Sequence, residues 1–137
     1  MKIILDSDLL GSLIGLVRAT EGNEDLITNE TNEIIIQALK TNDLNLINKI
    51  EQEKRRLVPD CYACGVNCGR NNNYDLNDLF KEEETIQNMK IQIINNLHTL
   101  AFDDKTQMKD IYQVLFLIGT NKPSYDDLFS CLEKILN

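Results

Sequence analysis

The sequence has little positive charge and no long apolar run. Its 137 residues contain 14 Lys and Arg against 22 Asp and Glu, which gives a formal net charge of −8. Because phosphate binding needs clustered Lys and Arg, this balance argues against a nucleic-acid partner. The one compact basic run, Lys54-Arg55-Arg56, is typical of a solvated helix end. No segment approaches the roughly 18 apolar residues of a membrane span, so no membrane association is expected.

Targeting signals and enzyme motifs are also missing. Asp6 and Asp8 interrupt the apolar amino-terminal stretch, which we therefore interpret as a helix of the domain and not as a signal peptide. The chain has no Gly-rich phosphate loop, no Ser nucleophile elbow and no H-E-x-x-H motif. The sequence therefore does not predict an enzyme acting on its own. We expect a cytoplasmic location, in which thiols stay reduced.

Apolar residues recur at helical spacings along nearly the whole chain, and there is no strand alternation or internal repeat. We therefore predict that residues 1–137 form one all-α domain, a bundle of about five or six helices. A cysteine-rich loop is expected between the third and the fourth helix. Asp43 and Ser124 are expected to cap helices, and Gly119 to end one. The expected helices cover the amino-terminal stretch to Val17 and residues 31–40, 43–57, 75 or 77 to 101, 104–118 and 123–137.

The segment VPDCYACGVNCGR, residues 58–70, holds three of the 4 cysteines. Cys61, Cys64 and Cys68 follow the pattern C-x2-C-x3-C, and thiolates this close together are typical of zinc and iron–sulfur sites. Gly65 and Gly69 would let the backbone curl so that the three sulfurs face one point. In a reducing compartment this pattern favours a metal or a reactive thiol over a disulfide.

A metal site of this kind needs a fourth ligand, because structural zinc and the common clusters take four. Arg70 could support the site by neutralising an anionic thiolate cluster, or it could be a surface cation near a helix end. An exogenous molecule could supply the fourth ligand. The candidates within the chain are Cys131, His98, Asp60 and Asp75.

Packing in the core is the competing interpretation. Cys61, Cys64 and Cys68 would share one face of a helix and act as small buried hydrophobes. A straight helix of seven residues is about 10 Å long, whereas zinc-bound sulfurs lie about 2.3 Å from the metal, so a regular helix cannot supply all three. Cys131 is expected to pack in the core, and His98 to be partly buried and hydrogen-bonded. A third interpretation makes Cys61 and Cys64 a reversible thiol switch.

The segment VPDCYACGVNCGRNNNYD resembles small, mostly helical proteins of clostridial-type bacteria that carry V-P-x-C-x2-C-x3-C-G-R followed shortly by Y-D. Some of these proteins are labelled as related to hydroxylamine reductase or hybrid-cluster proteins. Hybrid-cluster enzymes are several times longer and need many more ligands. The resemblance therefore implies a small helical family with a link to metal, and not an enzymatic activity. The matching residues are Val58, Pro59, Cys61, Cys64, Cys68, Gly69, Arg70, Tyr74 and Asp75.

These observations together predict a function. We expect a cytoplasmic helical protein whose cysteine loop binds zinc or an iron–sulfur cluster, as an accessory or electron-transfer module. The alternatives are a helical interaction or adaptor protein whose cysteines only pack, and a thiol redox sensor. A protein partner is expected, nucleic acid and membrane are not, and a homo-oligomer is left open.

Overall fold

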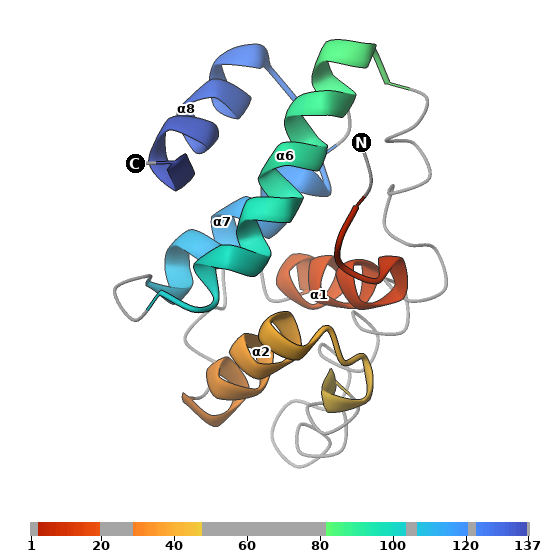
Figure 1. Cartoon of the computed structure of the whole chain (residues 1–137), viewed down its shortest axis with the longest axis vertical. Coiled ribbons are helices and arrows are strands. Elements are labelled where there is room, and N and C mark those ends of the chain that lie inside the picture. Colours follow the sequence, from red (N-terminus) through yellow and green to blue (C-terminus); the bar gives the residue numbers. More distant parts are fainter. Residues whose placement is uncertain (1–2, 20–28, 48–81, 104–106, 121–122, 137) are drawn as a thin grey trace.

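The computed structural model describes residues 3–19, 29–47, 82–103, 107–120 and 123–136, and all regular structure in these ranges is helical (Figure 1). This confirms the predicted all-α class. The predicted cysteine loop lies outside the described residues. A further helical turn begins at residues 45–47. The helices with defined bounds are α1 (Ser7–Ala19), α2 (Asn29–Thr41), α6 (Glu84–Leu100), α7 (Met108–Ile118) and α8 (Tyr125–Leu136).

The long helix α6 organises the described part of the molecule. It spans 17 residues and contacts α2, α7 and α8, while α1 packs against α7. In Figure 1, α6 crosses the middle of the view, α8 runs beside its first half, and α7 passes behind its second half. Helices α1 and α2 lie below them. The core contains buried side chains from all five of these helices, with α6 in contact with α2, α7 and α8.

Helix α1 is the most enclosed of these elements. Every residue from Leu9 to Val17 is buried, including Gly11 and Gly15. A helix that is apolar all round is stable in water only when other elements cover all its faces. The amino-terminal apolar stretch is therefore a helix of the domain, as predicted, and the structure adds that residues 9–17 are buried on all faces.

Local hydrogen bonds explain where three of the helical segments begin. Asp6 Oδ1 accepts hydrogen bonds from the backbone N–H groups of Asp8 at 2.8 Å and of Leu9 at 3.2 Å. Ser124 Oγ accepts one from the N–H of Asp127 at 3.2 Å, and Asp43 Oδ1 accepts one from the N–H of Asn45 at 2.9 Å. These bonds satisfy amides that have no partner within the helix. The predicted caps at Asp43 and Ser124 are confirmed.

The predicted starts of the two middle helices are wrong. The sequence predicts a start of the long helix at Asp75 or Asn77, but α6 begins at Glu84 because Glu83 is extended, with φ −53° and ψ 142°. Helix α7 begins at Met108, not near residue 104, because Gln107 is extended as well. Its predicted end at Gly119 is confirmed.

Candidate functional site

Most of the residues predicted to form a metal site lie outside the part of the chain that the structure describes. This holds for the three cysteines of the C-x2-C-x3-C pattern, for both aspartates and for the arginine: Cys61, Cys64, Cys68, Asp60, Asp75 and Arg70. Two candidate ligands, His98 and Cys131, are described. They lie on different helices, α6 and α8.

Cys131 packs against the hydrophobic core from α8. It is half-buried, and its neighbours one turn away on the same helix are the buried Leu128 and the partly buried Ile135. Burial raises the pKa of the Cys131 thiol, and the charge of Lys134 opposes this shift only in part. Burial of this kind is typical of a cysteine that packs as a small apolar side chain. The predicted packing role is confirmed.

His98 joins α6 to α2. Its Nδ1 lies 2.7 Å from the backbone oxygen of Leu39, and its ring meets Phe102 edge to face with 5.4 Å between the ring centroids. A carbonyl oxygen can only accept, so Nδ1 carries a proton, and Nε2 is the nitrogen that could supply a lone pair to a metal. A metal-bound histidine commonly has this arrangement, with its other nitrogen donating to a carbonyl. His98 is half-buried and hydrogen-bonded, as predicted.

No metal-binding group of three or more His, Cys, Asp or Glu side chains occurs among the described residues. His98 and Cys131 are therefore not part of a ligand set that the described helices complete. A metal site in this protein would need ligands from outside the described residues. In the same described ranges, no helix has both the length and the apolar character that crossing a membrane requires.

Ile47 and Glu82 are the described residues nearest in sequence to the cysteine segment, and both side chains are buried. Ile47 is fully buried at the last described position before the cysteine segment. Glu82 is the first described position after it, and its side chain is only 6% exposed in an ion pair with Lys90. The adjacent Glu82, Glu83 and Glu84 predict a solvated face. Glu82 departs from this prediction because its carboxylate turns inward to a buried cation.

Lys90 forms the centre of a polar cluster inside the core. It is 3% exposed, and its ammonium group makes three hydrogen bonds. Nζ lies 3.1 Å from Glu82 Oε1, 3.2 Å from the carbonyl oxygen of Ile118 and 2.9 Å from that of Thr120. An ammonium has three donors, so each has an acceptor here. Lys90 therefore has no donor left for a substrate, and its role is structural.

A second cation completes this cluster. Arg18, in the last turn of α1, donates from Nη1 to the carbonyl oxygen of Gly119 at 2.7 Å. The last carbonyls of a helix carry partial negative charge and have no partner within the helix. Lys90 from α6 and Arg18 from α1 satisfy these groups at the end of α7. The cluster thus joins three helices at the place where the chain returns from the cysteine segment.

The periodicity and motifs of the sequence did not predict this cluster. The position of Lys90 among apolar residues is the feature that could have indicated it. Lys90 is four residues from Ile86 and from Ile94, so it stands within the apolar stripe of α6. A lysine in such a stripe must either reach solvent or find acceptors in the core. Glu82 stands eight residues before Lys90 and outside α6, so helical periodicity does not predict that the two residues pair.

Comparison with known proteins identifies no relative: no family model, no curated protein and no solved structure matches this chain.

Proposed function

We propose that this chain is a cytoplasmic helical protein that binds a zinc ion or an iron–sulfur cluster through Cys61, Cys64 and Cys68. It would serve as an accessory or electron-transfer module for a protein partner. The observation that carries the proposal is the C-x2-C-x3-C spacing with Gly65 and Gly69 between and after the cysteines. Thiolates on a curled backbone of this kind bind soft metals in a reducing compartment.

The described helices support the proposal through what they supply at each end of the cysteine segment. Ile47 is packed in the core on one side, and Glu82 is bound to Lys90 on the other. The cysteine motif therefore lies, in the sequence, between two positions that belong to the helical core.

Of the two described candidates for the fourth ligand, His98 suits a metal better than Cys131 does. The hydrogen bond from Nδ1 to the Leu39 oxygen makes Nε2 the nitrogen of His98 that could bind a metal. Burial raises the pKa of Cys131, which disfavours the thiolate. Asp60, Asp75 and an external ligand are the other candidates, and Arg70 would balance the negative charge of the thiolates.

The test is metal analysis of the full chain purified without oxygen. We expect about one zinc per chain, or about four irons with matching acid-labile sulfide for a cubane cluster. Cys64→Ser is expected to abolish this content. Cys131→Ser is the matched control, because it removes a cysteine from the α8 core and should leave the metal in place. His98→Gln tests the fourth ligand separately.

Two results would contradict metal binding by these cysteines. Less than about a tenth of an equivalent of zinc, iron and sulfide in the wild-type chain would contradict the proposal, since structural sites fill stoichiometrically. Equal metal content in wild type and Cys64→Ser would also contradict it. Circular dichroism of each variant establishes that the helices are still formed.

A further inference from the structure

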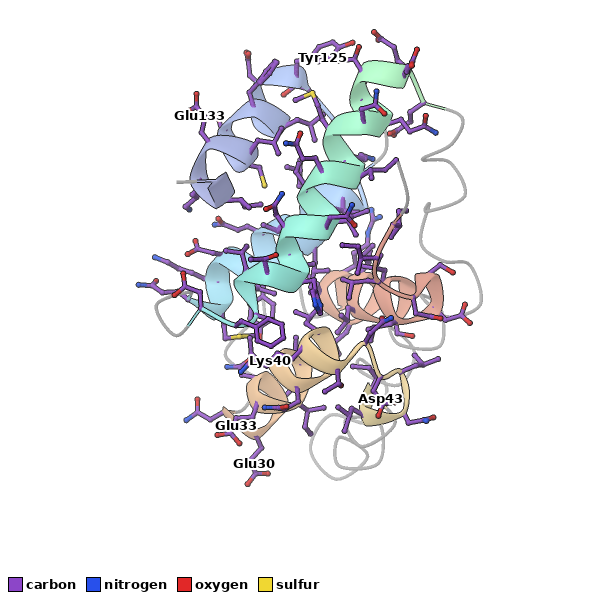
Figure 2. All side chains as sticks on the ribbon, in the orientation of Figure 1. Glu30, Glu33, Lys40, Asp43, Tyr125 and Glu133 are labelled. Atoms are coloured by element: carbon purple, nitrogen blue, oxygen red, sulfur yellow. The ribbon has the colours of Figure 1, made fainter. Side chains whose placement is uncertain are left out.

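The exposed face of α8 combines aromatic and acidic side chains. Tyr125, Phe129 and Glu133 follow one another at intervals of four residues, so they form one row along the helix. All three are exposed, with Tyr125 39% and Phe129 54% accessible to solvent. Figure 2 shows Tyr125 at the start of α8 beside the first turn of α6, and Glu133 projecting away from the bundle.

Carboxylates surround the two rings. Asp126 and Glu133 are exposed on α8, three residues before and four residues after Phe129. Glu83, from the residue before α6, accepts a hydrogen bond from the Tyr125 hydroxyl through Oε2. This hydrogen bond raises the pKa of the Tyr125 phenol, so the ring stays neutral. Tyr125, Asp126, Phe129 and Glu133, together with Glu83, are called the α8 face below.

No cation in the described part of α8 balances this charge. The one basic residue of the helix, Lys134, is directed to Asp110 of α7, with Nζ 3.0 Å from Oδ1. Lys134 is five residues from Phe129, which places it well around the helix from the aromatic row. Among the described residues, the α8 face therefore presents two exposed rings together with the carboxylates of Glu83, Asp126 and Glu133.

We infer that the α8 face is a docking surface for a basic, amphipathic segment of a protein partner. The argument is charge complementarity around an aromatic centre. Lys or Arg side chains of the partner would pair with Asp126, Glu133 and Glu83, and their cations would also lie favourably over the ring faces. Aliphatic side chains of the same segment would cover Phe129, the large exposed ring at the middle of the row.

This surface contains none of the residues proposed as metal ligands, because its members lie on α8 or directly before α6. Docking at the α8 face would leave the buried side of α8, with Leu128 and Leu132, on α6 and α7. Loss of metal binding and loss of docking can thus be measured separately.

Binding of a defined peptide to the full chain tests the inference. The probe is a fluorescent amphipathic helical peptide made of Leu and Lys, and its matched comparator replaces every Lys by Glu. We expect fluorescence anisotropy to report binding of the Lys peptide alone. Binding should weaken several-fold at high salt, because the Debye length shrinks from about 10 Å at 0.1 M to about 3 Å at 1 M.

The decisive variant is Phe129→Ala, which keeps the charge of the chain. We expect it to weaken binding of the Lys peptide by about tenfold, as for an aromatic anchor at an interface centre. Phe102→Ala is the matched control, because Phe102 is 58% exposed at the opposite end of α6 from Glu83. It should bind the Lys peptide as the wild type does.

Four results would overturn the inference. The first is equal affinity of Phe129→Ala and wild type, and the second is equal loss in Phe129→Ala and Phe102→Ala. The third is a dimer in sedimentation that Phe129→Ala dissociates, because a second copy of the chain would then occupy the face. The fourth is binding to phosphatidylcholine–phosphatidylserine vesicles that depends on Phe129.

Discussion

At the scale of single residues, the most consequential one is a lysine within an apolar stripe. Lys90 is buried, and its ammonium group contacts Glu82 and the carbonyl oxygens of Ile118 and Thr120. Burying an ammonium costs several kcal/mol, and only close and complete hydrogen bonding offsets that cost. The position is therefore far less tolerant of change than any lysine on the surface.

We expect Lys90→Met to lower the free energy of unfolding by about 3 kcal/mol, because it leaves the buried Glu82 carboxylate without its cation. Urea denaturation followed by circular dichroism measures the change. Lys134→Met is the control, since its ion pair with Asp110 is exposed on the lysine side and should contribute less than about 1 kcal/mol. Equal effects of the two substitutions would show that Lys90 does not stabilise the core.

Residue environments could be predicted from the sequence only where neighbours in the same helix determine them. Cys131 is half-buried beside Leu128 and Ile135, as its spacing predicts. The position of Ile94 four residues earlier predicts the partial burial of His98 in the same way. Its acceptor, the Leu39 oxygen, lies 59 positions away in the chain and could not be predicted.

At the scale of elements, the end of α7 shows how a turn is determined by packing as well as by conformation. Gly119 has φ −76° and ψ −8°, values that any residue adopts, so left-handed backbone is not the reason for glycine here. The reason is the neighbouring helix: a Cβ at this position would lie 2.5 Å from Ile14 Cγ2 of α1. The sequence predicted the helix end correctly but not its cause.

Gly119→Ala is accordingly expected to destabilise the protein by about 1 to 3 kcal/mol through overpacking. Without the clash, Gly→Ala at a compatible backbone conformation would stabilise by about 0.4 to 1 kcal/mol. The effect should be much smaller in an Ile14→Ala background, where Cγ2 is absent. Thermal and urea unfolding of the wild type, the two single variants and the double variant give the coupling energy between Gly119 and Ile14. A stabilising effect of Gly119→Ala in the wild-type background would contradict the packing argument.

Some helix starts are determined by neighbouring residues in the sequence, and others by contacts with distant residues. Capping side chains lie within three residues of the amides they serve, so Asp43 and Ser124 could be identified from the sequence. The start of α6 at Glu84 follows from a bend at Glu83, and Glu82 before this bend reaches the buried Lys90. The bend has no signature in local helix propensity, because glutamate is a good helix former.

At the scale of the whole molecule, α1 is enclosed on every side. Leu13 in its middle is fully buried, whereas Ile4, just before the helix, is 56% exposed. The two residues have similar side-chain volume and both lie near the amino terminus. They differ in how completely the other elements of the molecule surround them.

We expect Leu13→Ala to cost about 2 to 5 kcal/mol, because the removed carbons leave a cavity in a close-packed interior. Ile4→Ala should change stability by less than about 0.5 kcal/mol. The backbone N–H of Ile4 donates to Asn95 Oδ1 at 2.9 Å, and this bond does not depend on the side chain. Guanidinium unfolding curves compare the two variants, and similar midpoints would show that α1 is not central to the core.

The sequence by itself determined the helical class, several helix ends, the excess of negative charge and the cysteine spacing. These properties depend on residues a few positions apart, whose hydrogen bonds and side-chain periodicity act within one helix. Only the tertiary structure decided that α1 is enclosed and that Lys90 and Arg18 hold the end of α7. Those contacts join residues 28 and 101 positions apart, as in Lys90 with Ile118 and Arg18 with Gly119. Local sequence cannot specify them, because packing between helices selects the partners.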